Sequence, residues 1–186
     1  SVSTAKIANS AVDLTSKVTG ILPVANGGNG FTTRPAFKVQ RRQNAGSQTG
    51  LYYSDIFKTG QTNGQIIVDY NIGNHFANGR FTCPVAGLYQ FTVVGLISET
   101  NGGVAGGNYT FIGYFTKNGE TDSDIIHPQI YYYHQSGNAG GYPILNYTQT
   151  YQLSANDVIG FRVQTGGLYA NNGNNYNAQF MGHLIG

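Results

Sequence analysis

The sequence predicts an all-β fold of short antiparallel strands, and three observations lead to this prediction. Aromatic residues are abundant, with 14 Tyr and 10 Phe among 186 residues. From Pro35 onward, short runs of alternating apolar and polar residues recur between clusters of Gly, Asn and Ser, as strands joined by turns would require. The same region shows no helical period. Strand number alone does not distinguish a sandwich from a barrel.

Period-two alternation between turn clusters defines each expected strand. It is clearest at Val158–Gln164, where Ile159, Phe161 and Val163 should face the core and Arg162 the solvent. In chain order the expected strands are Ala36–Arg42, Gln65–Tyr70, Arg80–Cys83, Gly87–Ile97, Tyr109–Lys117, Asp124–His134, Ile144–Leu153, Val158–Gln164 and Asn177–Ile185.

Two of these strands carry apolar residues on both faces. One face can fill a core, whereas the other would be a large exposed apolar patch on a monomer. Either a neighbouring subunit or loops of the same chain would have to cover it. The outward set on the two strands is Leu88, Val94, Leu96, Ile112 and Tyr114.

Composition divides the chain into two parts near Phe31–Pro35. Residues 1–33 lack a core pattern, and Gly27-Gly28-Asn29-Gly30 interrupts regular structure. We therefore expect an extended N-terminal segment at 1–33 and one β-rich head at 34–186.

Charge and cysteine content exclude several classes of protein. Only 10% of the residues are charged and the net charge is +2 without a basic run, so no nucleic-acid partner is expected. No apolar stretch approaches the roughly 20 residues of a membrane span, so no membrane insertion is expected. One cysteine precludes an internal disulfide framework, and Cys83 should be a small buried apolar residue. We interpret Arg41-Arg42 as a solvated strand end.

Specific motifs resemble a known family. Within Arg80–Phe91, the residues Phe81, Gly87, Tyr89 and Phe91 stand where a complement component 1q-like globular head has its signature residues. Phe180-Met181-Gly182-His183-Leu184 resembles the closing strand of that family. The family shares the trimeric jelly roll of tumour necrosis factor. The resemblance therefore implies a ten-stranded jelly-roll sandwich that forms a homotrimer.

The N-terminal part resembles a different group of proteins. Val12–Gly30 is similar to a segment found repeatedly in bacteriophage tail fibres. This resemblance implies an extracellular location on a virion, as a phage tail or capsid appendage. It also implies other fibre or tail proteins as partners.

Aromatic residues on the predicted strands are candidates for the core or the trimer interface. Tyr131-Tyr132-Tyr133 is the densest cluster, and core plus subunit contact is favoured there over direct ligand contact. The full candidate set is Tyr89, Phe91, Phe111, Phe115, Tyr131, Tyr133 and Phe180.

Catalytic and metal-binding residues are not expected. Asp122 and Asp124 could mimic a glycosidase pair, but they lie at a predicted turn, where solvated carboxylates are the ordinary outcome. No catalytic residue, metal ligand or cofactor is predicted. Calcium is the alternative that the resemblance raises, since Asp122-x-Asp124 with His127 offers ligands without a calcium-loop pattern.

Loop composition points to recognition at the end of the head that is far from the N-terminal segment. Loops of an antiparallel meander alternate between two ends, which places Ser98–Asn108, Gln135–Pro143 and Gly166–Tyr176 at that end. Tyrosine and asparagine suit stacking and hydrogen bonding, so the candidates are Tyr142, Tyr169, Asn171 and Asn172.

The sequence thus predicts a non-enzymatic trimeric tip of a phage fibre. Its expected partner is a host surface receptor, with carbohydrate as one candidate. One alternative is a structural virion decoration or trimerising fibre cap without specific receptor binding. Another is a secreted head of the same fold, against which the fibre-like segment argues.

Overall fold

The computed structural model describes residues 34–42, 54–58, 65–98, 109–119, 124–134, 143–169 and 178–186. The chain divides into two units, Ser1–Arg34 and Pro35–Gly186. The fold described here is that of the second unit. The N-terminal segment expected at 1–33 lies outside the described residues.

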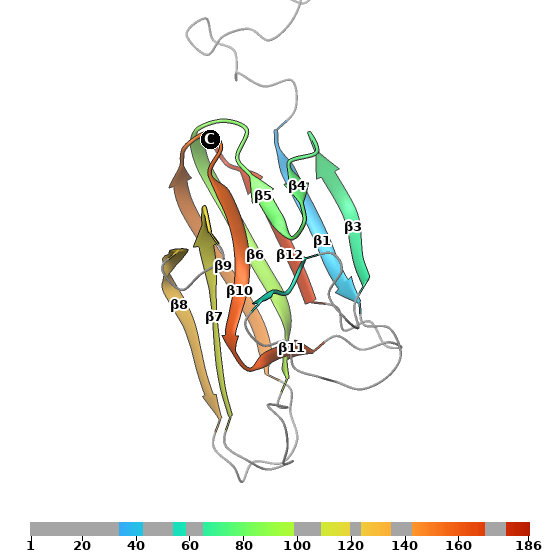
Figure 1. The fold of residues 1–186 in the computed structure, drawn as a ribbon, viewed down its shortest axis with the longest axis vertical. Coiled ribbons are helices and arrows are strands. Elements are labelled where there is room, and N and C mark those ends of the chain that lie inside the picture. The colour runs from blue at the N-terminus through green and yellow to red at the C-terminus, as the bar shows by residue number, and fades with distance from the viewer. Residues whose placement is uncertain are drawn as a thin grey trace, which may run out of the picture. The chain divides into compact units, whose positions relative to one another are not determined.

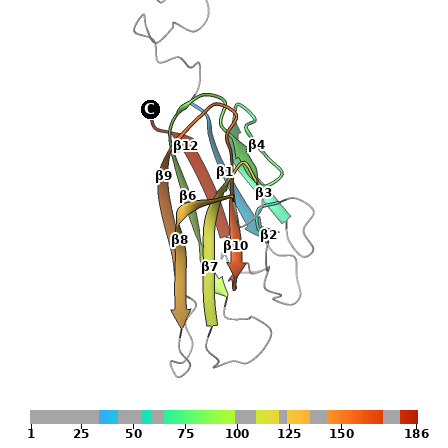
Figure 2. The same ribbon diagram turned by 60° about the vertical axis from the view of Figure 1, so that its left-hand side comes forward.

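The strands of the described residues form two antiparallel sheets that face each other (Figures 1 and 2). Sheet A contains β1 (Ala36–Arg42), β3 (Gln65–Ile72), β6 (Gly87–Ser98), β9 (Ile144–Leu153), β11 (Gly167–Tyr169) and β12 (Ala178–Leu184). Sheet B contains β2 (Ser54–Asp55), β4 (Phe76–Ala77), β5 (Arg80–Thr82), β7 (Tyr109–Lys117), β8 (Ile125–His134) and β10 (Val158–Thr165).

Nested strand pairings make this sandwich a jelly roll. β1 pairs with β12, β5 with β10, β6 with β9, and β7 with β8. Early strands therefore pair with late ones, as they do when one long antiparallel hairpin folds over itself. The predicted fold class is confirmed. The described residues contain twelve strands, because the short strands β2, β4 and β11 add to the nine that alternation predicted.

The core between the sheets is built mainly from phenylalanine. The Phe37 ring stacks on Phe76 at 4.6 Å and on Phe81 at 5.0 Å, and meets Phe180 edge-on at 4.8 Å between ring centroids. These contacts join β1 and β12 of sheet A to β4 and β5 of sheet B. Such ring pairs add about 0.5–1.5 kcal/mol each beyond their burial.

Two sequence predictions about the core are confirmed. Ile159, Phe161 and Val163 on β10 are fully buried, as their alternation indicated. Cys83 is also fully buried and makes no disulfide.

A segment that the sequence did not single out closes one part of the core. Ile56 and Phe57 follow β2 and are almost completely buried, and the Phe57 ring lies 5.4 Å from that of Phe180. Gly79 has φ +84°, and a Cβ there would come within 2.8 Å of the Lys58 nitrogen. The close approach of the 54–58 backbone thus depends on glycine at this position.

The interpretation of Arg41 as a solvated residue is wrong. Its side chain is only 3% exposed, and Nη1 donates a hydrogen bond of 2.5 Å to the carbonyl oxygen of Ile56. Burial lowers the pKa of Arg41 to about 10, which still leaves the group charged at neutral pH. The arginine therefore ties β1 to the buried segment after β2.

The sequence predicts an apolar patch on the outward face of β7 that a neighbouring subunit or loops of the same chain would cover. Tyr114 is fully buried within the single chain, although it lies on the face of β7 opposite to Phe111 and Phe115. Residues of the same chain cover this ring, so no neighbouring subunit is needed there. On β6, by contrast, Leu88 remains 38% exposed.

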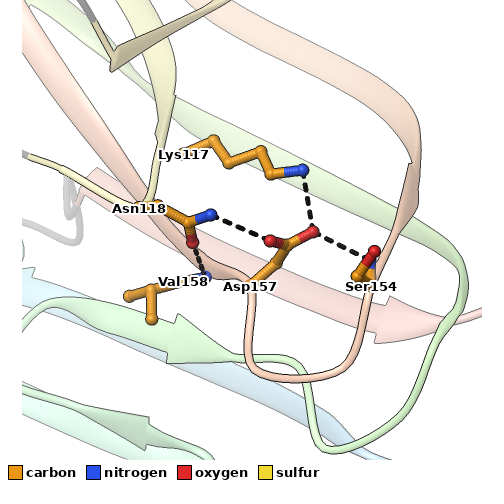
Figure 3. A network of polar contacts seen from close by, with 5 residues as sticks. All are labelled: Lys117, Asn118, Ser154, Asp157 and Val158. Carbon is orange, nitrogen blue, oxygen red and sulfur yellow. Dashed lines mark hydrogen bonds and ion pairs between the residues drawn. The ribbon is translucent and has the colours of Figure 1, made fainter.

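A polar network fastens the turn between β9 and β10 to the end of β7 (Figure 3). The Asp157 carboxylate pairs with Lys117 Nζ at 2.8 Å and accepts hydrogen bonds from Asn118 Nδ2 and the Ser154 amide. The Asn118 side chain also accepts from the Val158 amide at 2.8 Å. Asn118 and Asn156 both have positive φ, which asparagine tolerates better than most residues.

Candidate functional site

The two ends of the sandwich differ in what they carry. At one end, here called the base, the Leu184 amide donates to the Pro35 carbonyl and the Leu88 amide donates to that of Gly186. The Lys117–Asp157 network and the C-terminus lie at this end, which is uppermost in Figures 1 and 2. The short turns of the head therefore gather where the head begins.

The opposite end, here called the distal end, collects the strand ends from which the long Gly/Asn-rich segments depart. Arg42 pairs with Gln65, Ser98 with Gly167, and Tyr109 with His134. The Ile97 amide also donates to the Pro143 carbonyl at 2.8 Å. These pairings bring the points of departure of 43–53, 99–108, 135–142 and 170–177 to one end.

The predicted receptor-binding residues fall mostly outside the described residues. Tyr142, Asn171 and Asn172 are among those not described. Tyr169 is the last residue of β11 and pairs with Leu96 of β6, and its side chain is not described. The four candidates therefore stay a prediction. The structure places only the backbone of Tyr169, which lies at the distal end.

The predicted core and interface residues separate into two groups. Within the single chain, Tyr89, Phe91, Phe111, Phe115 and Phe180 are fully buried between the sheets. Tyr131 and Tyr133 are 68% and 53% exposed on β8. The first group fills the core of the protomer, and the second lies on its surface.

Sheet A carries most of the exposed large apolar side chains of the described residues. They lie on β3, on β6, at the start of β9 and just after β12. The set is Val68, Tyr70, Ile72, Leu88, Ile144 and Ile185, of which Ile144 is the most exposed at 75%. The sequence prediction had named only Leu88 of these. Alternation of Val68, Tyr70 and Ile72 with polar Asp69 and Asn71 is the signal that could have found the others.

Charge on the outer face of sheet A is largely neutralised within the chain. Lys38 Nζ lies 3.2 Å from an Asp69 carboxylate oxygen, and Gln40 donates to both oxygens of that carboxylate. The Gln40 hydrogen bonds, together with Lys38, hold the pKa of Asp69 below its usual value. Thr92 and Thr148, paired across β6 and β9, share a hydroxyl hydrogen bond of 2.9 Å. The face thus carries little unpaired charge, and its exposed apolar side chains Tyr70, Ile72 and Leu88 lie among uncharged polar ones such as Thr92 and Thr148.

The titratable groups that the structure describes are arranged for stability. Burial raises the pKa of the Cys83 thiol to about 12, so this thiol is protonated at neutral pH and is a poor nucleophile. No three His, Cys, Asp or Glu side chains of the described residues gather as metal ligands would. Asp122 and the side chain of His127, which the calcium alternative needs, are outside that part of the chain. No helix long and apolar enough to cross a membrane occurs among the described residues.

Comparisons with known proteins give likenesses of fold. No protein-family model and no curated protein matches the chain. One similar solved structure is the globular domain of zebrafish complement 1qA protein, with TM-score 0.49 and 16% identity over 83% of this chain and 98% of that one. Pika GITRL gives TM-score 0.40 at 16% identity over 83% and 98%. Rabbit GITRL gives 0.38 at 15% over 80% and 94%. The jelly-roll assignment itself rests on the strand pairings described above.

Proposed function

We propose that this chain is the non-enzymatic, trimeric tip of a bacteriophage fibre, and that it binds a host-cell surface receptor with its distal end. The observation that carries the proposal is the separation of the two ends. The base holds short, hydrogen-bonded turns and the start of the head, and every long segment rich in Gly and Asn departs from the distal end. Long loops on a rigid scaffold are where binding residues concentrate.

The fibre part of the proposal is supported by the resemblance of Val12–Gly30 to phage tail-fibre segments. A fibre that joins the head at Pro35 would leave the distal end free for a cell surface. Only 10% of the residues are charged, which suits recognition of a receptor through stacking and hydrogen bonds.

The trimeric part is supported by the outer face of sheet A. Tyr70, Ile72 and Leu88 are exposed there on strands whose charged groups pair with one another. A monomer with such a face would carry an apolar patch open to water. Closed three-fold assembly covers the face on every copy without leaving a free end.

The test of receptor binding uses the labelled full chain and a panel of intact bacterial strains. Fluorescence retained on cells after washing should reveal a binding strain. On that strain, Tyr169→Ala combined with Asn172→Ala should reduce retention at least several-fold, because three copies per tip multiply the loss at each site. The thermal melt should be nearly unchanged.

A matched control replaces an exposed residue at the base. Thr82→Ala lies on β5, near the base turns, and should leave retention unaltered. Retention that survives replacement of residues in all four segments that leave the distal end, 43–53, 99–108, 135–142 and 170–177, would refute distal binding. The structural fibre cap would then be the better account of the chain.

A further inference from the structure

The exposed aromatic pair on β8 is not accounted for by the core or by the outer face of sheet A. Tyr131 and Tyr133 are the only large apolar side chains of the described residues that are exposed on sheet B. Their partners on β7 are Ile112 and Thr110, which lie on the face opposite to the buried ring of Phe111. The pair therefore faces outward from sheet B, whereas the proposed trimer contact is on sheet A.

The geometry of β8 holds the two rings in one row. Residues two apart on a strand project from the same face and are separated by about 7 Å. Tyr132, between them, is half-buried and has an interaction partner. Among the described residues, neither Tyr131 nor Tyr133 has a hydrogen-bond partner for its hydroxyl or a ring packed on its own. Both rings and both hydroxyls are thus available to a ligand.

The size of the pair argues against a protein partner. A tyrosine can bury about 150–250 Å². At 68% and 53% exposure, the two rings together present roughly 250 Å². A stable protein interface needs about 800 Å² from each partner. The pair is therefore of a size for a small ligand or a short stretch of a chain molecule.

The surroundings of the pair indicate a neutral ligand. The positions paired with it across the sheet are Ile112 and Thr110 on β7, neither of which is charged. Two flat apolar faces with phenolic donors and acceptors, next to a threonine hydroxyl, suit a molecule with apolar C–H faces and many hydroxyls. The geometry points to a binding site for a neutral saccharide chain, which stacks on Tyr131 and Tyr133 and bonds their hydroxyls.

This site lies close to the distal end, because Tyr133 precedes the last residue of β8 (Figure 1). The site gives the proposed receptor a ligand class, which is a neutral saccharide. The inference rests on the proposed function only in taking the host-cell receptor as the source of that saccharide. A glycan bound by the distal loops could extend down the outside of sheet B and contact the pair. The stacking itself needs nothing from the loops.

Saturation-transfer NMR with the full chain and millimolar neutral oligosaccharides tests the inference. The probes are maltoheptaose, cellohexaose and mannohexaose. At least one should show ring-proton saturation with the native chain, and Tyr131→Ala with Tyr133→Ala should remove most of that signal. Tyr131→Phe with Tyr133→Phe should retain a large part of it, since the stacking face is kept.

The matched control is Thr82→Ala, an exposed position of β5 on sheet B near the base, which should leave the signal unchanged. No saturation with any of the three probes, or a signal that survives the double alanine variant, overturns the inference. A changed mass of the double variant in light scattering would assign the pair to a subunit contact and would also overturn it. A native chain that shows the Tyr131–Tyr133 signal but binds none of the bacterial strains would count against the proposed function and would leave this inference standing.

Discussion

Asp157 shows how one residue at the base combines burial with charge. Burial alone would raise the pKa of this carboxyl, but hydrogen bonds from Lys117, Asn118 and the Ser154 amide outweigh it and hold the pKa below its usual value. The backbone of the same residue is bonded as well, because the Cys83 amide donates to the Asp157 carbonyl at 2.8 Å. Through its side chain and its backbone, this one residue links β7, the turn between β9 and β10, and Cys83, which follows β5.

The pH dependence of stability follows from the sign of that shift. A carboxyl whose pKa is lower in the folded state stabilises the fold above its unfolded pKa, about 3.9, and loses this contribution as the pH falls through the folded value. We expect the melting temperature to fall steeply below about pH 4. Asp157→Asn should cost about 1–3 kcal/mol at pH 7 and flatten this acid dependence.

Asp69→Asn is the control for this measurement. Asp69 also has a lowered pKa, but its ion pair with Lys38 is more exposed, and such pairs contribute about 0–1 kcal/mol. Chemical denaturation at pH 7 and at pH 3 would compare the variants. A variant Asp157→Asn that is as stable as the native chain at pH 7 would contradict the structural role of the network.

At the scale of elements, the centre of sheet A depends on how closely β12 approaches the phenylalanine core. Gly182 pairs with Phe37 on β1 and with Phe91 on β6. A Cβ at Gly182 would lie 2.5 Å from Phe91 Cδ1 and 2.8 Å from Phe37 Cε1. Neither ring has room to move, because each packs on other rings of the core.

Gly182→Ala should therefore destabilise the head by about 1–3 kcal/mol, the usual cost of an overpacked core. Gly95→Ala is the matched control on the neighbouring strand β6, since its nearest contacts would be ordinary ones at 3.5 Å. This second change should be neutral or slightly stabilising, because alanine has less backbone entropy to lose than glycine. Equal effects of the two substitutions in urea denaturation would show that the packing around Gly182 is looser than described.

At the scale of the whole molecule, the two apolar surfaces have separate assignments. We propose the outer face of sheet A for assembly and the Tyr131–Tyr133 pair for a ligand. Light scattering of the full chain should give three times the 20.0 kDa of a single chain. Tyr70→Glu with Leu88→Glu should lower the mass toward that of one chain, because it places charge on the apolar face.

Tyr131→Glu should leave the mass unchanged and serves as the control on sheet B. Deletion of residues 1–31 tests whether the head assembles by itself, and we expect 34–186 to keep its cooperative melt and its threefold mass. A native chain of 20.0 kDa at micromolar concentration would refute the trimer. A truncated chain that loses its melt would show that the boundary is wrong.

Local pattern determined the fold class of this protein and much of its core. Alternation on β10 and the aromatic residues of β6 and β12 identified which side chains face inward, because a strand has only two faces and one of them must be buried. Spacing along the strands also indicated that the long loops leave from one end. These features depend on neighbours in the sequence, so the sequence carries them directly.

Only the tertiary structure decided which outward-facing residues stay exposed. Tyr114 and Arg41 are buried, whereas Tyr131 and Tyr133 are open, yet all four stand on strands with similar local patterns. Their burial depends on what lies opposite in space. Arg41, for example, meets the Ile56 carbonyl of a segment that no alternation singles out. A contact between segments distant in the sequence is set by the fold as a whole, which is why the exposed tyrosine pair on β8 became visible only in the structure.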